Sequence, residues 1–223
     1  MGLTLDFIEI GTSDFNTLLE SCSDTQKGMS VEPLKLYLDN LPDKPNVQKV
    51  NAAIVDNNLV NSVDVYYIDP KIITEQGLEW WMKGCNSIEK PHPFHTYYLP
   101  HGAKFPRNLL EEGLVTKSTA LTFTYGRLLK EYDVDYVDYI KLDTEGFDAI
   151  ILNTILDYYS FSNKPKPKKI LFETNEHNDR QKSLEVCHRL ISLGYKLQVG
   201  TADYGDYQDF DGFILYDCLA TLP

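Results

Sequence analysis

Short apolar runs alternate with segments of helical spacing along most of the chain. The runs typical of strands fall at residues 5–10, 27–31, 47–55, 62–68, 120–124, 136–142, 169–173, 195–199 and 212–216. Apolar residues at helical spacing occur at 34–41, 128–129, 149–156 and 183–193. Strands that alternate with helices predict a doubly wound α/β domain, with a mostly parallel sheet and helices on both faces. The last two runs have no helix between them, so we expect an antiparallel C-terminal hairpin.

Residues 70–117 follow neither pattern. Glycine and proline interrupt this stretch, which contains Trp80-Trp81 and Pro91-His92-Pro93. Structureless connections of this length are uncommon inside a compact domain unless they have a function. We therefore expect a single domain over residues 1–223, with a lid or substrate-binding insertion at about 70–117.

Two turns have recognisable chemistry. Asp56-Asn57-Asn58 separates the runs at 47–55 and 62–68, and this composition predicts a hairpin between them. Gly11 ends the first run, and Thr12-Ser13-Asp14 follows it. Small polar residues of this kind cap helix N-termini, so the pattern predicts a strand, a tight turn and a helix.

The net charge and the cysteine content limit which binding partners and which cellular compartment we expect. The formal net charge is −12, which repels phosphate backbones and anionic lipid headgroups, so we expect neither nucleic acid nor a membrane as partner. The four cysteines are scattered and form no metal-binding or disulfide pattern, which indicates reduced thiols. We find no secretory leader pattern and no apolar run long enough to span a bilayer. The expected location is the cytoplasm.

Notable polar residues follow the predicted strands, where open α/β sheets bind ligands. Gly11 lets the backbone approach a ligand, and Glu32 ends the second strand about 20 residues later, where nucleoside-binding folds place an acid that holds the ribose. The glycine-rich phosphate-binding pattern G-x-G-x-x-G is absent, and Asp14 would repel a pyrophosphate. These features favour a nucleoside without phosphates, of which S-adenosylmethionine is the common one. The alternative is an ordinary turn with an unrelated acid downstream.

Four motifs follow one another along the chain, namely Glu9-Ile10-Gly11, Val31-Glu32-Pro33, Asn51-Ala52-Ala53 and Lys141-Leu142-Asp143-Thr144-Glu145-Gly146. Together they resemble the FkbM family of S-adenosylmethionine-dependent methyltransferases. The resemblance covers most of the chain outside residues 70–117, and the K-x-D-x-E-G element is its most specific part. It implies a Rossmann-like class I methyltransferase sheet and O-methylation. The chain departs from the family in its first turn, where Gly11 is the only glycine.

Carried over by position, the resemblance implies which residues bind the cofactor. Gly11 would lie under the methionine part, Glu32 would hold the ribose hydroxyls, and Asn51-Ala52 would flank the adenine. The neighbouring motif residues complete the predicted cofactor set of Glu9, Gly11, Thr12, Ser13, Glu32, Pro33, Asn51 and Ala52.

Asp143 and Glu145 are the predicted catalytic residues. They are two positions apart, so they would share one side of the chain if the strand continued through Thr144. Such a pair can share a proton and act as a base for a substrate hydroxyl. It can instead bind a divalent cation such as Mg²⁺ or Mn²⁺, with Asp143 as the candidate ligand. The structural alternative is that one acid caps the next helix and the other pairs with Lys141 or Arg127.

The insertion supplies the predicted acceptor site. Asn86, His92 and His95 are expected to line an acceptor pocket, with Trp80 or Trp81 as an aromatic face for a sugar or ring. An equally simple alternative is a lid held together by its own aromatic side chains. Cys85, His92, His95 and His101 could also ligate zinc, but their spacing matches no standard pattern.

The sequence thus predicts a methyltransferase that uses S-adenosylmethionine to O-methylate a small polar hydroxyl acceptor, such as a sugar or glycan. Two other functions stay open. One is a binding module that kept the fold and lost turnover, which the reduced glycine turn suggests. The other is a nicotinamide-dependent oxidoreductase, which the missing G-x-G-x-x-G disfavours.

Overall fold

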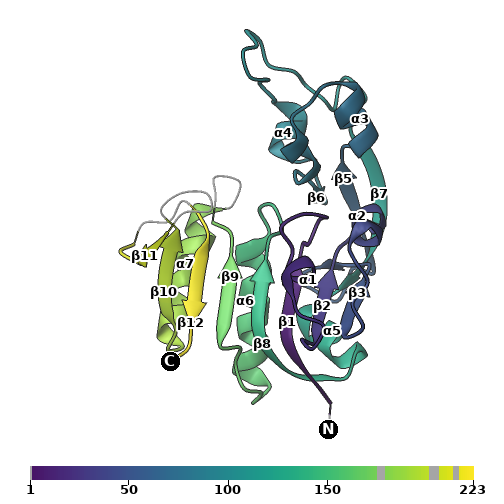
Figure 1. Cartoon of the computed structure of the whole chain (residues 1–223). Coiled ribbons are helices and arrows are strands. Elements are labelled where there is room, and N and C mark those ends of the chain that lie inside the picture. Colours follow the sequence, from purple (N-terminus) through teal and green to yellow (C-terminus); the bar gives the residue numbers. More distant parts are fainter. Residues whose placement is uncertain (1, 175–178, 201–205, 213–215) are drawn as a thin grey trace.

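The computed structural model describes residues 2–174, 179–200, 206–212 and 216–223 (Figure 1). Within these ranges the main element is an eight-stranded sheet. Its strands, in spatial order, are β11 (Tyr207–Asp209), β10 (Lys196–Gly200), β12 (Cys218–Thr221), β9 (Lys169–Phe172), β8 (Val134–Leu142), β1 (Leu3–Ile10), β2 (Gly28–Val31) and β3 (Val47–Val50). The strands from β9 to β3 are mutually parallel, and β12 is antiparallel to both β9 and β10. The mostly parallel α/β sheet with an antiparallel C-terminal pair is therefore confirmed.

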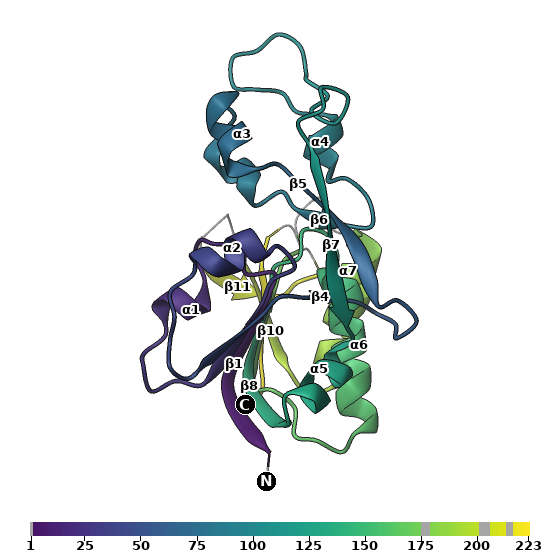
Figure 2. The ribbon, with the colours of Figure 1, turned by 90° about the vertical axis from the view of Figure 1, so that its right-hand side faces the viewer.

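Helices cover both faces of this sheet (Figure 2). One face carries α1 (Leu18–Ser21) and α2 (Lys35–Asn40), and the other carries α5 (Tyr125–Glu131), α6 (Asp148–Phe161) and α7 (Arg180–Ser192). Because neighbouring strand residues point to opposite faces, Phe7 joins the apolar cluster of Leu19 and Leu38, whereas Ile8 joins the larger cluster that includes Leu152. Burial of these apolar side chains on both faces is the main force that holds the sheet.

A second, smaller sheet carries the insertion. Its strand order is β4 (Ala53–Ile54), β7 (Thr116–Phe123), β5 (Ser62–Tyr67) and β6 (Ser87–Ile88). Between β5 and β7 lie α3 (Pro70–Glu75), the 3₁₀ helix η1 (Trp80–Lys83), β6 and α4 (Pro93–Thr96). Buried residues including Ile68, Met82, Tyr98 and Leu109 give this segment its own apolar cluster. Residues 70–117 are thus a folded segment built from short elements, which carry too few residues for a period to show in the sequence.

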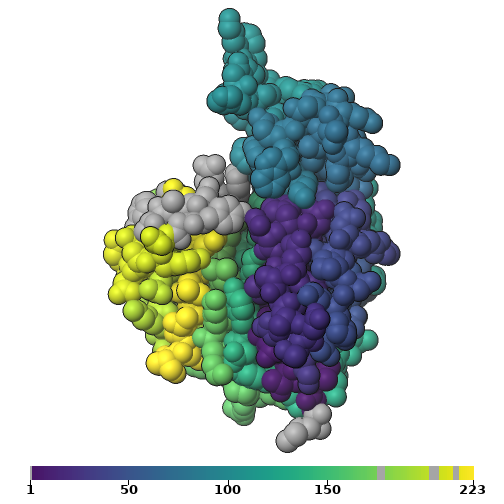
Figure 3. Space-filling view, viewed as in Figure 1, coloured from purple at the N-terminus to yellow at the C-terminus, as the bar shows by residue number. Residues whose placement is uncertain are grey.

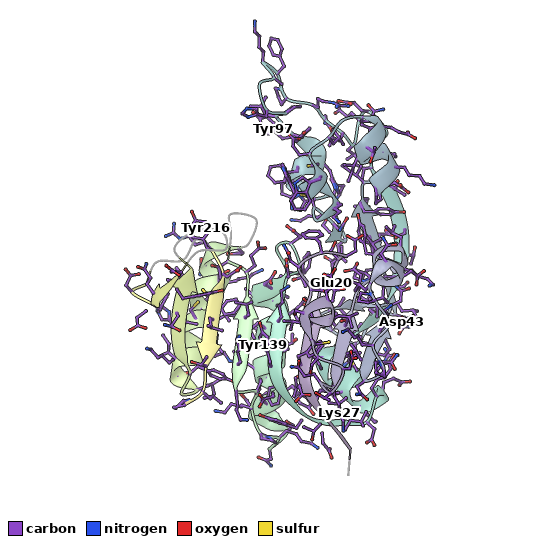
Figure 4. The ribbon with its side chains drawn as sticks, in the orientation of Figure 1. Glu20, Lys27, Asp43, Tyr97, Tyr139 and Tyr216 are labelled. Atoms are coloured by element: carbon purple, nitrogen blue, oxygen red, sulfur yellow. The ribbon has the colours of Figure 1, made fainter. Side chains whose placement is uncertain are left out.

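The segment stands above the carboxyl ends of the central strands. Figure 3 shows it as a teal mass over the purple N-terminal region. In Figure 4, Tyr97 lies on this upper segment, whereas Tyr139 lies on β8 in the main sheet. Any ligand that binds at the strand ends therefore meets residues of both parts.

The structure corrects the prediction for residues 47–62. The predicted strand at 47–55 divides into β3 and β4, which belong to different sheets. Asn51 lies at the break, and its side-chain amide donates to the carbonyl oxygens of Glu32 and Pro33. The predicted hairpin at 56–58 is wrong, because β4 pairs in parallel with β7 while β5 pairs antiparallel with β7.

The predictions for the first helix and for the last strand also change. The first helix is not capped by Thr12-Ser13-Asp14, since α1 begins at Leu18 and the Thr17 hydroxyl accepts the Glu20 amide. The last strand among the described residues is β12, which begins at Cys218, two residues after the predicted run at 212–216. Gly212 lies in a bend with φ of 99°, and residues 213–215 of that run lie outside the described residues.

Candidate functional site

A pocket lies where the carboxyl ends of the central strands meet the insertion. Its cavity volume is about 180 Å³. Its lining comes from the turn after β1, the end of β2, β4, the turn after β8 and the segment just before and along β6. The lining residues are Ile10, Gly11, Thr12, Ser13, Phe15, Val31, Glu32, Pro33, Ala52, Ala53, Ile54, Val65, Gly84, Asn86, Ser87, Ile88, Asp143, Thr144, Glu145, Phe147, Ile151 and Glu173.

The turn after β1 depends on Gly11. Its φ is +80°, and a Cβ atom there would lie 1.9 Å from the carbonyl oxygen of Asp143. Only glycine permits this approach of the two turns. Thr12 and Ser13 follow on the lining, and the Thr12 hydroxyl is buried without a hydrogen-bond partner among the described residues. A buried hydroxyl of this kind is a natural contact for a bound molecule.

Glu32 forms the next part of the wall. Its two carboxylate oxygens accept the backbone N–H groups of Ser13, at 2.9 Å, and Leu34, at 2.8 Å. Burial raises its pKa to about 7, and the charge of Asp143 adds to this. Because each carboxylate oxygen has a second lone pair, Glu32 can still accept hydroxyl groups from a ligand.

Two predicted cofactor residues lie elsewhere. Glu9 is fully buried, forms an ion pair with Lys141 at 2.8 Å and accepts the Leu18 N–H at 2.8 Å. The exposed Asn51 side chain holds the backbone of Glu32 and Pro33. Neither belongs to the described lining, so both support the wall from behind. The other six predicted cofactor residues, namely Gly11, Thr12, Ser13, Glu32, Pro33 and Ala52, line the pocket.

Asp143 and Glu145 both line the pocket, but not by strand alternation. The strand β8 ends at Leu142, and Glu145 takes a φ of +51° in the turn that follows. The conformation of this turn therefore orients the two carboxylates toward the pocket. Burial raises the pKa of Asp143, although Lys141, 4.0 Å away, acts in the opposite sense. Burial and the charge of Asp143 raise the pKa of Glu145 to about 8.

Glu173 and Asp148 belong to the same acid cluster and were not predicted as site residues. Glu173 follows β9 and lines the pocket, and burial together with the nearby charges of Glu145 and Asp143 raises its pKa to about 10. Asp148, at the start of α6, accepts the Thr144 hydroxyl at 2.9 Å and the Glu173 N–H at 3.3 Å, and burial raises its pKa to about 7. The sequence held a signal for Glu173, since the run at 169–173 ends in this acid.

The described lining contains four acids and no lysine, arginine or histidine. The nearby lysines have other partners, since Lys141 pairs with Glu9 and Lys83 pairs with Asp14 at 2.7 Å. The pocket therefore suits a positively charged ligand and disfavours a phosphate. Within the described ranges, no group of three or more His, Cys, Asp or Glu side chains is arranged to hold a metal ion.

Only one of the three predicted acceptor residues lies on the pocket lining. Asn86 lines the pocket, whereas His92 and His95 are buried behind it and do not reach the described lining. His92 caps α4, its Nδ1 accepting the Phe94 N–H at 3.2 Å, and its Nε2 lies 3.4 Å from Oε2 of Glu145. Burial lowers the pKa of both histidines to about 4. The expectation that they line the pocket is wrong, because the two side chains are 1% and 0% exposed and lie behind the described lining.

Aromatic side chains pack together beside the mouth of the pocket. Phe15 lines the pocket, and Trp80 packs edge-on against it with ring centres 5.7 Å apart. Trp80 is 64% exposed, so one side of its ring is open to solvent beside the mouth. Trp81 instead packs against Phe94, with ring centres 5.2 Å apart, inside the insertion.

Comparisons of the chain with protein-family models, with curated proteins and with solved structures found no match. Among the described residues, no helix has both the length and the apolar character that crossing a bilayer requires. The four cysteines are buried free thiols.

Proposed function

We propose that the chain is a methyltransferase of the FkbM type that uses S-adenosylmethionine to O-methylate a small polar hydroxyl acceptor, such as a sugar or glycan. The observation that carries the proposal is the acid-lined pocket, which suits a cationic cofactor. The strand order β3-β2-β1-β8-β9-β12-β10-β11 supports it. The resemblance implies a seven-stranded sheet whose last-but-one strand is antiparallel, and β12 takes that place when the additional edge strand β11 is set aside. The four motifs also contribute to one pocket.

The residues present fit the cofactor. Glu32 would hold the ribose hydroxyls, while Pro33, Ala52 and Ile54 would form an apolar slot for the adenine. The buried Thr12 hydroxyl, which lacks a partner among the described residues, would bind the methionine part above Gly11. When bound, the cofactor supplies a methyl group on a positively charged sulfur. The carboxylates nearby favour that charge over the neutral product.

The acid pair would act on the acceptor. Asp143 is the preferred base, since its raised pKa lets it take the proton of the acceptor hydroxyl as the oxygen forms its bond to the methyl carbon. The cofactor would supply the methyl group, and its sulfur would keep the electron pair of the bond that is broken. Asn86 of the insertion and Phe15 of the segment after β1 would orient the acceptor and exclude water.

Titration calorimetry with S-adenosylmethionine, its demethylated product and reduced nicotinamide dinucleotide tests this proposal. We expect saturable binding of the first two and much weaker binding of the third, whose pyrophosphate would meet the acids Glu32 and Asp143 of the lining. Glu32→Gln should weaken cofactor binding by about 10- to 100-fold, the loss expected for hydrogen bonds to a charged group. The exposed Glu131→Gln on α5, away from the described lining, is the matched control. No saturable heat with the first two ligands would refute the proposal.

Methyl transfer needs a separate assay. Incubation with S-adenosylmethionine labelled on its methyl group and a panel of sugars and polyols should give labelled product with at least one of them. Normal cofactor binding without transfer to any acceptor would favour the non-catalytic binding module.

A further inference from the structure

The turn after β1, residues 11–16, forms part of the pocket wall and lies outside any helix or strand. Three of its residues take left-handed backbone conformations, with φ of +80° at Gly11, +46° at Ser13 and +55° at Asn16. Such angles are unfavourable for residues other than glycine. Contacts from outside the turn therefore have to offset this cost.

The insertion supplies one of these contacts through Lys83. Its ammonium group donates a hydrogen bond to Oδ1 of Asp14 at 2.7 Å, and the two side chains are 24% and 13% exposed. The same nitrogen lies 4.7 Å from the centre of the Phe15 ring, in the geometry of a cation–π contact. One lysine therefore contacts two neighbouring residues of the turn. In Figure 3 the insertion rests on the purple region that contains this turn.

The insertion also encloses the Phe15 ring, which lines the pocket. Trp80 packs edge-on against this ring, with ring centres 5.7 Å apart. A Cβ atom on Gly84 would lie 3.0 Å from Cζ of Phe15, so the glycine leaves room for the ring. The insertion thus helps to fix a ring that a ligand in the pocket would contact.

Other contacts of the turn come from the main sheet and its helices. Oδ2 of Asp14 accepts the side-chain amide of Asn40, the last residue of α2, at 3.0 Å. The Ser13 N–H donates to Glu32 at 2.9 Å. These contacts stay within the half of the molecule that holds the turn. The bond from Lys83 to Asp14 instead spans 69 residues of sequence and joins the turn to the insertion.

We propose that Lys83 is a positioning residue, through which the insertion holds the turn after β1 in the conformation that lines the pocket. The insertion then shapes a wall of the pocket that belongs to the main sheet. The holding of the turn does not depend on the function proposed above. Only its consequence for cofactor binding rests on that function.

Two substitutions remove the contact with little change in side-chain shape. Lys83→Met keeps an apolar stem beside Phe15 but carries no charge, and Asp14→Asn keeps the shape of the acid without its charge. Lys83→Arg keeps a positively charged donor and should rescue the contact. Lys71→Met, at an exposed position on α3 of the insertion, is the matched control.

Amide hydrogen exchange followed by nitrogen-15 NMR measures the turn without any ligand. The Ser13 N–H should exchange about five- to tenfold faster in Lys83→Met than in the wild type, as expected when a partly buried charged hydrogen bond is lost. Lys83→Arg and Lys71→Met should stay near the wild-type rate. The N–H of Ile140, a buried residue of β8, should keep its rate in every variant, because only a general loss of stability would change it. The double variant of Lys83→Met and Asp14→Asn should exchange no faster than the faster single variant, since both substitutions remove one contact.

A Ser13 rate in Lys83→Met equal to that of the wild type, or additive effects of the two substitutions, would overturn the proposal. If the wild type binds S-adenosylmethionine, Lys83→Met should bind it more weakly than Lys71→Met, by up to the same factor, because binding then has to order the turn. Equal affinities of these two variants would refute the consequence for the cofactor. If the exchange result holds and the wild type binds no S-adenosylmethionine, the positioning role stands and the proposed function fails.

Discussion

Cofactor binding should release a proton. In the free protein some acids of the pocket are protonated, and a positively charged ligand would favour their ionised form. The acid to follow is Glu145, whose pKa of about 8 in the free protein results from burial and from Asp143. At pH 7, roughly nine in ten Glu145 side chains are therefore protonated by the ordinary titration relation. A sulfonium placed nearby would return the pKa toward its usual range and release about one proton per cofactor bound.

The sign and size of the pH effect follow from linkage. Since the complex holds fewer protons than the free protein, affinity should rise with pH and level off above about pH 8, the pKa of free Glu145. The expected slope is about tenfold per pH unit between roughly pH 6 and pH 7.5. The demethylated product, which lacks the sulfonium charge, should show a smaller slope.

Calorimetry at pH 7 in phosphate and in Tris measures the proton directly, because the two buffers differ in ionisation enthalpy. Glu145→Gln should remove most of the buffer difference and flatten the affinity profile. Glu131→Gln is again the control. Equal heats in both buffers for the wild type, or a pH slope that persists in Glu145→Gln, would refute the assignment of the proton to this side chain.

Four further predictions follow from the same residues. Gly11→Ala should lower the melting temperature and abolish cofactor binding, since its Cβ would lie 1.9 Å from the Asp143 carbonyl oxygen; an unchanged melting curve contradicts this. Asp143→Asn should abolish methyl transfer with near-normal cofactor affinity, and normal turnover would return Asp143 to a structural role. Added Mg²⁺ or Mn²⁺ should restore activity after chelation if a cation assists the acid pair, and activity that chelation leaves unchanged excludes that mechanism. Glu32 and Asp148 have pKa values of about 7 in the folded chain, raised by burial, so the free protein should lose thermal stability as pH rises from about 5 to 7 because the folded state binds the extra protons.

The sequence predicted the central sheet well because its strands have long apolar runs. The run at 136–142 lies within β8, and the one at 169–173 matches β9 with the acid Glu173 at its end. Burial on both faces imposes such runs. Six of the eight predicted cofactor residues lie on one pocket for the same reason, since strand ends in a parallel sheet meet at one edge.

The sequence was less informative wherever tertiary contacts override local pattern. The run at 47–55 is continuous in sequence, and only the contacts of Asn51 and the pairing of Ala53 with Thr122 show that it serves two sheets. The burial of His92 and the inward ion pair of Glu9 also depend on partners far away in the chain. Contacts between residues that are far apart in the chain produce no periodic pattern in the sequence.

The insertion leaves and rejoins the second sheet at neighbouring points. Tyr67, at the end of β5, is paired directly with Thr116, at the start of β7. All of residues 68–115 therefore begin and end on two adjacent strands, as a hairpin loop does. A segment of another length could be grafted between these two positions without altering the register of β5 and β7. The ligand preference of the pocket could then diversify by exchange of one closed segment, while the half of the pocket built by β1, β2 and β8 stays as it is.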